Sequence, residues 1–139
     1  MLIIIMEQIG RRIDANRRYL EKLVAAPFYR FDDKLRSLLP EKPGIYRIII
    51  TSSQETLRAG TTKSSDSLRQ RVYQNHLMGN QTGNIRSQLV RAGMCKDLDA
   101  AKSFLQSSCS VQWIVIEDKE ERKWAEHFVL ALLQPTFSD

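Results

Sequence analysis

The sequence predicts an α+β fold, a three-stranded antiparallel sheet flanked by helices and preceded by a helical N-terminal extension. Two short segments, residues 44–51 and 55–61, are rich in β-branched residues or extended in character and are separated by a tight turn, which is typical of a β-hairpin. A third strand is expected over residues 109–117. Helical segments precede the hairpin, separate it from the third strand and follow that strand, and this order lacks the alternation of a parallel sheet.

The length and composition indicate one globular domain. A chain of 139 residues has room for a single core, and two separate cores would be cramped. The residues are 42% hydrophobic and 27% charged without a low-complexity tract or repeat, which excludes a disordered or fibrous protein. We expect residues 1–40 to form the helical extension and residues 41–139 the main domain, together in one compact unit.

The first forty residues contain two helical segments. Over residues 7–25, apolar residues recur at roughly helical spacing between charged ones, which predicts an amphipathic helix ending before Pro27. A short second helix is expected over residues 32–39. The apolar start, residues 1–6, lacks a basic segment and is too short for a signal-peptide core or a membrane span, so the cytoplasm is the expected location.

Capping residues mark the later helices. One is expected after the hairpin, with Ser65 or Asp66 as its N-cap and Gly79 just past its other end. The last helix ends before Pro135 and carries acidic residues at its positive end, where they are favoured. After the helix that follows the hairpin, three more helices are expected, over residues 84–92, 97–106 and 118–133.

The basic charge is concentrated in the middle of the chain. Of a net charge of +5, residues 58–102 contribute eight basic against three acidic side chains. A polyanion such as nucleic acid is therefore a plausible partner, because lysines and arginines that neutralise phosphates release condensed counterions. The alternative is a basic surface that serves only solubility.

The two cysteines do not indicate a metal centre. Cys95 and Cys109 form no CxxC pair, and neither lies near a histidine at zinc-site spacing. We expect two reduced thiols.

Glu126 is the only acid between Trp124 and Leu133, where eight of ten residues are apolar. A helix of this composition is expected to be buried, and a carboxylate is rarely buried without a partner, because it loses hydration energy that packing does not return. A cation should therefore lie beside Glu126, either a divalent metal ion or an arginine.

Four motifs occur in order and resemble those of the GIY-YIG endonuclease superfamily, over about residues 43–137. Gly44-Ile45-Tyr46 opens the first strand, and Arg58-Ala59-Gly60 ends the second strand where the family has Tyr-Ile-Gly. The sequence Leu-Arg-Gln-Arg then places the family's catalytic arginine at Arg71, and Glu126 is followed nine residues later by Pro135, as in the family's last motif.

The resemblance implies a metal-dependent endonuclease that hydrolyses DNA phosphodiester bonds with a single Mg²⁺ or Mn²⁺. Glu126 would hold the metal, since hard cations prefer oxygen ligands and keep several waters. Arg71 would bind phosphate oxygens with its rigid fork of donors. Tyr46 would position or deprotonate the attacking water, although a phenol with a free pKa of about 10 needs a nearby cation to act as a base. His76 is the fourth candidate catalytic residue.

His76 lies one residue away from the position that the family pattern predicts, because many family members carry a histidine or tyrosine four residues after the arginine. Here that position is Asn75, and His76 lies about 140° around an ideal α-helix from Arg71. His76 therefore reaches the site only if the helix loosens toward Gly79. His127 is expected either on the helix surface or as a residue that contacts Glu126 without touching the substrate. The candidate substrate-binding residues are Arg58, Lys63, Arg69, Tyr73 and Asn75.

Each assignment has a structural alternative. Glu126 could form a buried ion pair with an arginine, Arg71 could be solvated, and Tyr46 could serve only packing. Arg58 departs from the family because it replaces a phenol with a cation, which could contact phosphate or mark a protein that binds nucleic acid without cutting it. A third possibility is an interaction domain whose N-terminal helix docks a partner. The preference for DNA or RNA and the oligomeric state stay open.

Overall fold

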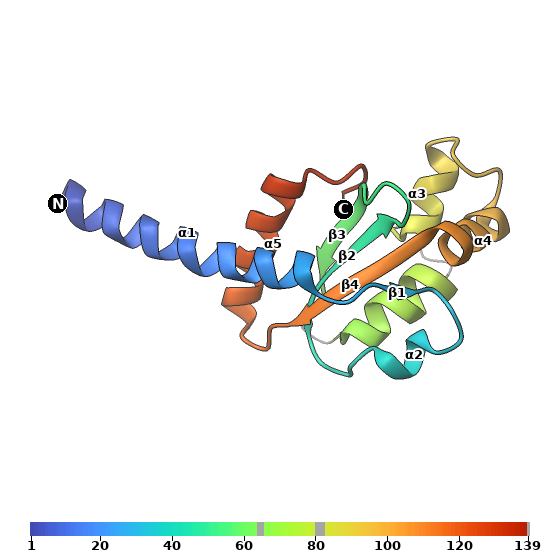
Figure 1. The fold of residues 1–139 in the computed structure, drawn as a ribbon, viewed down its shortest axis with the longest axis horizontal. Helices are drawn as coiled ribbons and strands as arrows, with labels where there is room; N and C mark the ends of the chain where they lie inside the picture. The colour runs from blue at the N-terminus through green and yellow to red at the C-terminus, as the bar shows by residue number, and fades with distance from the viewer. Residues whose placement is uncertain (64–65, 80–82, 139) are drawn as a thin grey trace.

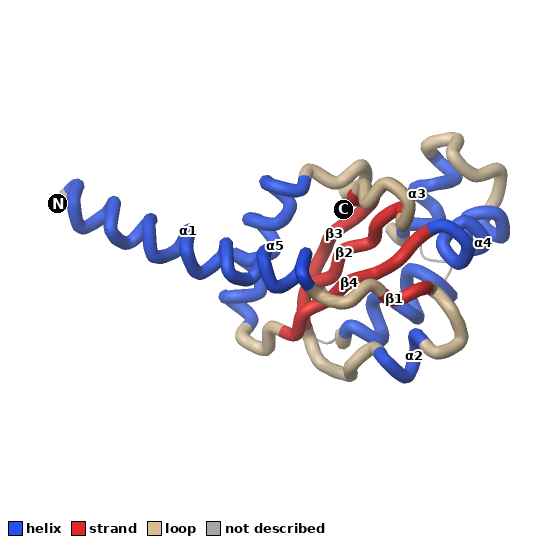
Figure 2. The backbone as a smooth tube through the Cα atoms, in the orientation of Figure 1, coloured by secondary structure: helices blue, strands red, loops and turns tan. Residues whose placement is uncertain are grey.

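The chain forms an α+β fold with an antiparallel sheet of four strands, in the order β1-β4-β2-β3, between two layers of helices (Figures 1 and 2). The computed structural model describes residues 1–63, 66–79 and 83–138. Within them the elements are α1 (Leu2–Ala25), β1 (Tyr29–Arg30), α2 (Leu35–Leu38), β2 (Gly44–Ile50), β3 (Thr56–Thr61), η1 (Arg69–Met78), α3 (Ile85–Arg91), α4 (Leu98–Ser108), β4 (Cys109–Val115) and α5 (Lys119–Leu133).

The prediction of a three-stranded sheet is wrong by one strand. The additional strand β1 comes from the N-terminal forty residues and pairs with β4, where Tyr29 lies opposite Val111 and Arg30 opposite Ser110. The ring of Tyr29 also stacks on Trp113 at 4.7 Å between centroids. A strand of two residues is too short to show the alternation that marks a strand in sequence, which explains why it was not predicted.

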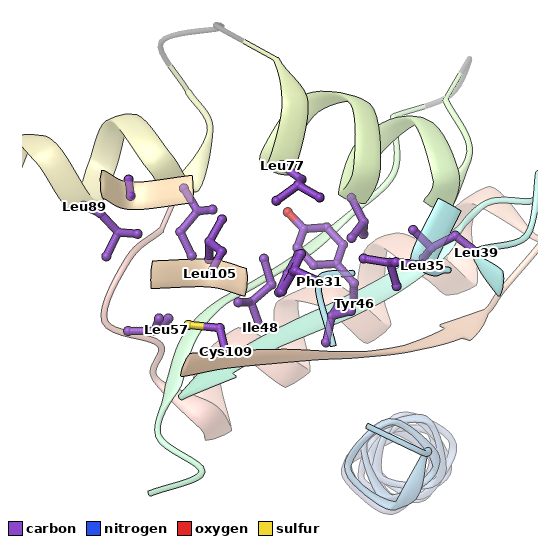
Figure 3. Close-up of a cluster of buried hydrophobic side chains, with 14 of the residues drawn as sticks. Phe31, Leu35, Leu39, Tyr46, Ile48, Leu57, Leu77, Leu89, Leu105 and Cys109 are labelled. Atoms are coloured by element: carbon purple, nitrogen blue, oxygen red, sulfur yellow. The ribbon is translucent and has the colours of Figure 1, made fainter. Parts of the chain in front are cut away.

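The two faces of the sheet carry separate parts of the core. On one face, the side chains of Tyr46 and Ile48 pack beneath α2, η1, α3 and α4 in a cluster that also contains Phe31 and Leu105 (Figure 3). On the other face, Ile45 and residues of β3 pack against α1 and α5. Successive residues of β2 therefore face opposite layers, as strand geometry requires.

Helix α1 is fixed to the sheet only at its C-terminal end. Leu23 is its one fully buried residue, and the Gln112 side-chain amide donates hydrogen bonds to the carbonyls of Val24 and Ala26, at 2.9 and 2.8 Å. The amide oxygen of Gln112 accepts from Arg47, which holds the amide in this orientation. The helix starts at Leu2, earlier than predicted, and its N-terminal half projects from the body (Figure 1).

The helix expected after the hairpin is η1, which is a π-helix. A helix with i→i+5 hydrogen bonds is rare and occurs frequently at functional sites. Its N-cap residue is Leu68, so the predicted cap Asp66 is wrong, while Ser65 lies outside the described residues. At its C-terminal end the carbonyl of Asn75 accepts from the Asn84 side chain and that of His76 from Arg86, so these helix-end groups are satisfied.

The predicted caps of the later helices are confirmed. The side chains of Asn84, Asp97 and Asp118 each accept a hydrogen bond from the backbone N–H three residues on, at the start of α3, α4 and α5. Over the described ranges 1–63, 66–79 and 83–138, the helices are all too short or too polar to cross a membrane.

Candidate active site

Tyr46 is placed by the pairing of β2 with β3. It lies opposite Gly60 in the antiparallel ladder, and its ring covers the position where a side chain at residue 60 would start. A Cβ atom on Gly60 would lie 2.7 Å from the Tyr46 hydroxyl oxygen and 3.1 Å from Cζ. The glycine of the Arg-Ala-Gly motif therefore leaves room for the Tyr46 ring to pack closely against β3, where any side chain would clash with it.

The Tyr46 hydroxyl contacts His76, which η1 brings over the same face of the sheet. The distance from Tyr46 Oη to His76 Nε2 is 2.6 Å. The backbone N–H of Ile85 donates to His76 Nδ1 at 3.1 Å, so Nδ1 carries no proton. Neutral imidazole then has its proton on Nε2, and His76 is the donor to Tyr46. The proton of the phenol consequently points to a different acceptor.

The electrostatics of His76 agree with the neutral form. Its ring is fully buried, and burial lowers its pKa well below 6.5, with the cations Arg58, Arg71 and Arg86 acting in the same direction. His76 thus stays neutral and keeps its donor directed at Tyr46 at physiological pH.

Arg58 is fully buried beside Tyr46. Its guanidinium donates to the carbonyl of Gly83 and to the side-chain oxygen of Gln88, each at 2.7 Å, and a hydrogen bond links it to Tyr46. Burial lowers the pKa of Arg58, while its interaction with Tyr46 opposes that change. The guanidinium of Arg58 is therefore held by fixed acceptors and directed at the phenol of Tyr46.

Arg71 and Glu126 complete the cluster at its accessible side. Both are half-buried. Burial raises the pKa of Glu126, and this effect is opposed by His127, a hydrogen bond from the backbone of Thr61, and the positive charges of Arg71 and Arg58. The charges of Arg71 and Arg58 thus act on Glu126 from a distance, since none of the described residues forms a salt bridge with Glu126 within 4 Å.

A pocket of about 300 Å³ opens beside Glu126, and basic residues dominate its lining. Lys63, a predicted substrate-binding residue, lies there with Thr61 and Thr62 from the end of β3. Helix α5 adds three basic residues that were not predicted, Lys119, Arg122 and Lys123. Their spacing to Glu126 is seven, four and three residues, the spacing of one helix face, so the sequence contained a signal for them.

Two of the candidate substrate-binding residues, Arg69 and Tyr73, make their contacts outside this cluster. Arg69 donates to the carbonyl of Leu39 and pairs with Glu41 at 2.7 Å, which ties η1 to the loop before β2. Tyr73 packs against the core beneath the helices. Asn75 is half-buried and its carbonyl accepts from Asn84.

His127 occupies the outer surface of α5, as expected. It is exposed, and its ring lies 5.7 Å from that of Trp124.

Sequence reasoning also missed Arg86. This arginine is almost fully buried, donates to the backbone carbonyl of His76, and adds a positive charge near the imidazole. Its Nη2 atom has no hydrogen-bond partner among the described residues.

Comparisons with protein-family models, with curated proteins and with solved structures find no significant match to this chain. The resemblance to the GIY-YIG superfamily therefore depends on the residues of the four motifs and on their order in the sequence.

Proposed function

We propose that the protein is a metal-dependent endonuclease that hydrolyses DNA phosphodiester bonds at the cluster around Tyr46. The supporting observation is the contact of 2.6 Å between Tyr46 and His76, within the electrostatic reach of Arg58 and Arg71, which also act on Glu126. A phenol, an imidazole, two guanidinium groups and a carboxylate from β2, β3, η1 and α5 thus converge. These are the groups that phosphoryl transfer to water requires.

Tyr46 would take the proton of the attacking water. His76 and Arg58 both direct donors at its hydroxyl oxygen, so they stabilise the negative charge that this oxygen carries when its own proton has left. Because His76 is fixed as a donor, it would act as a positioning residue for Tyr46 and would not itself accept the proton.

Arg71 and the pocket lysines would bind the phosphate. A guanidinium remains charged at all physiological pH values and offers paired donors to phosphate oxygens. Lys63, Lys119 and Lys123 line the pocket next to Glu126, where a sugar-phosphate backbone would follow the end of β3.

Glu126 fits the role of ligand to a single Mg²⁺ or Mn²⁺. Burial destabilises the charged form of its half-buried carboxylate and so raises its pKa. A bound cation would stabilise the charged form. No group of three or more His, Cys, Asp or Glu side chains gathers in the described part of the chain, so water and phosphate oxygens would supply the other ligands. When bound, the ion would stabilise charge on the phosphoryl oxygens and on the leaving oxygen.

The experiment is a nicking assay on supercoiled plasmid with Mg²⁺, Mn²⁺ or EDTA. We expect nicking by the wild-type protein with either metal and none in EDTA. Glu126→Gln, Arg71→Ala and Tyr46→Phe should each lower the rate by at least about a hundredfold, because each removes a group that acts in the transition state.

The matched control is Glu120→Gln. It makes the same change of a carboxylate to an amide on the same helix, at an exposed position that does not line the pocket. Its nicking rate should equal that of the wild type. Nicking that persists in EDTA, or a Glu126→Gln variant as active as the wild type, would contradict the proposal.

The second candidate function is a nucleic-acid-binding module that does not cut. The observation that favours it is the complete burial of Tyr46, Arg58 and His76, because a substrate reaches the phenol only if neighbouring chain moves aside. In this case the pocket would bind DNA with an affinity that falls with salt, at a log–log slope of about −3 to −4 for four basic contacts. Fluorescence anisotropy at several salt concentrations, with no nicking at any metal concentration, would identify this function.

A further inference from the structure

The segment after α5, residues 134–138, lies along the free edge of the sheet, and we call it the tail. The backbone N–H of Thr136 donates to the carbonyl of Thr56 at 3.1 Å. The backbone N–H of Phe137 donates to the carbonyl of Leu57 at 2.7 Å. Because β3 is the last strand in the order β1-β4-β2-β3, the tail covers an edge that would otherwise expose unpaired backbone groups (Figure 1).

The tail also contacts the layer of helices above the candidate site. Phe137 lies opposite Arg58 in a parallel bridge, and its half-buried ring packs against the core beneath those helices. The carbonyl of Ser138 accepts a hydrogen bond of 2.7 Å from the side-chain amide of Gln88 on α3. The tail therefore joins the edge of β3 to α3.

Gln88 connects the tail to Arg58 through the two ends of its amide. Its Nε2 donates to the carbonyl of Ser138, and its Oε1 accepts from Arg58 Nη1, each at 2.7 Å. A carbonyl oxygen can only accept a hydrogen bond and a guanidinium can only donate one, so both partners require the same orientation of the amide. In the reversed orientation, the amide nitrogen would face the guanidinium and the amide oxygen would face the carbonyl, and both contacts would be repulsive.

The orientation of Gln88 affects the position of Arg58 and, through it, the contact with Tyr46. Arg58 Nη1 donates to both Gln88 Oε1 and the carbonyl of Gly83, and two acceptors on one nitrogen fix the plane of the guanidinium. The same side chain is hydrogen-bonded to Tyr46. Because Arg58 is fully buried, loss of the Gln88 acceptor would leave a charged donor unsatisfied in the interior, and the guanidinium would turn to find another acceptor.

We propose that Gln88 is a positioning residue for Arg58, and that the tail fixes the orientation of the Gln88 amide. This role rests on the proposed function, in which Arg58 stabilises the charge on the Tyr46 oxygen after its proton has left. Gln88 acts through Arg58 and needs no contact with the substrate.

Gln88→Met tests the positioning role, because it keeps the length of the side chain and removes both ends of the amide. In the plasmid nicking assay kcat should fall by about tenfold to a hundredfold, as for a small displacement near the reacting group. KM for DNA should stay at the wild-type value, since the change leaves the proposed phosphate-binding residues in place. The rate should also reach its plateau at a higher pH than in the wild type, because the charged form of Tyr46 loses a fixed donor. The matched control, Gln106→Met, makes the same change at an exposed position of α4 and should alter none of these quantities.

Phe137→Ala tests the part played by the tail, because it removes the anchor of the tail in the core and leaves Gln88 unchanged. It should lower kcat by less than Gln88→Met does, since the amide can still accept from Arg58 but is no longer fixed. Added to Gln88→Met, it should lower kcat no further, because the tail acts through the amide. Thr136→Pro removes one backbone hydrogen bond to β3 and should behave in the same way, which provides a second and milder variant. Circular dichroism verifies that each variant is folded.

Heteronuclear NMR of the Arg58 side chain gives a measurement that does not depend on nicking. Guanidinium protons that are buried and held by fixed acceptors exchange slowly with water and give a resolved signal. This signal, assigned by correlation to the backbone of Arg58, should be present in the wild type and in Gln106→Met. It should be broadened or lost in Gln88→Met.

An unchanged Arg58 signal in Gln88→Met, or wild-type values of kcat and of the pH profile in that variant, would overturn the positioning role of Gln88. Equal effects of Phe137→Ala with and without Gln88→Met would overturn the role of the tail. If the wild-type protein does not nick and Gln88→Met still loses the Arg58 signal, the proposed function is refuted, while the hold of Gln88 on Arg58 is confirmed.

Discussion

Replacing Gly60 by alanine tests whether the close packing of Tyr46 across β3 is required. The new Cβ would lie 2.7 Å from the Tyr46 hydroxyl oxygen, and ordinary contact begins at 3.4 Å, so the ring must move by about 0.7 Å. The ring cannot rotate aside freely, because His76 holds its hydroxyl at 2.6 Å. An inserted methyl group in a packed core costs about 1–3 kcal/mol. A displacement approaching 1 Å at a reacting group costs about a hundredfold in rate.

Two measurements on Gly60→Ala separate these effects. Urea denaturation should show the loss of stability, and the nicking assay should show the loss of rate under conditions where the variant is fully folded. The matched control is Gly83→Ala, since a Cβ there has nothing within 4 Å, and it should change neither quantity. A Gly60→Ala variant with wild-type stability would refute the packing argument, and one with wild-type nicking would refute the role of Tyr46.

A double variant makes the test specific to the phenol oxygen. Tyr46→Phe removes the atom that a Cβ at residue 60 meets at 2.7 Å, leaving contacts of 3.1 and 3.3 Å that small shifts accommodate. Tyr46→Phe alone also leaves the buried donor of His76 without its partner, at a cost of about 1–3 kcal/mol. In the Gly60→Ala background the same change should therefore cost less stability than in the wild type, while nicking stays lost.

Three further predictions follow from the environment of single side chains. Burial and the neighbouring arginines hold the pKa of His76 well below 6.5 in the folded protein, so below pH 6.5 the unfolded chain binds one more proton, and the free energy of unfolding should fall by about 1.4 kcal/mol per pH unit as the pH drops toward the folded pKa. Urea titrations should show this dependence in the wild type and its loss in His76→Gln. Burial raises the pKa of the Cys109 thiol to about 12, whereas Cys95 is half-buried, so maleimide at neutral pH should label Cys95 in the folded protein and Cys109 only after unfolding, as mass spectrometry can determine. Arg69→Ala should lower stability by less than about 1 kcal/mol and leave nicking unchanged, because Arg69 pairs with the exposed Glu41, whereas Arg71→Ala should abolish nicking, because the charge of Arg71 acts on Glu126.

Local sequence signals predicted most of the fold because most of its elements are marked locally. The segments 44–51 and 109–117 contain strands β2 and β4, and the caps at Asn84, Asp97 and Asp118 begin three helices as predicted. Strand β1 was missed since its two residues are defined by tertiary pairing alone. Its position depends on the stacking of Tyr29 on a distant strand, which no local pattern encodes.

The sequence indicated candidate residues by type, but it did not indicate the π-helix that holds Arg71 and His76. The spacing of Arg71 and His76 excludes a shared face in an ideal α-helix, and the π-helix removes that obstacle because residues five apart then lie nearly one above the other. Helical periodicity in a sequence is evaluated for a turn of 3.6 residues, so it does not predict the wider turn of a π-helix. The pairing of Arg69 with Glu41 could not be predicted either, because it depends on the position of the loop before β2.

The substitution of Arg58 for a phenol has a structural consequence that links the two candidate functions. A buried guanidinium fixed by Gly83 and Gln88 cannot leave to follow a substrate, so its charge acts permanently on Tyr46. In a protein that cuts, this fixed donor replaces a second phenol as the group that stabilises charge on Tyr46. In a protein that only binds, the same charge would contribute to the field that attracts phosphate. Arg58→Tyr distinguishes the two, because a tyrosine, the residue of the GIY-YIG motif, keeps a hydrogen-bonding group at Tyr46 but removes the charge. A nuclease should retain measurable nicking. A binding module should lose affinity for DNA and should show no nicking.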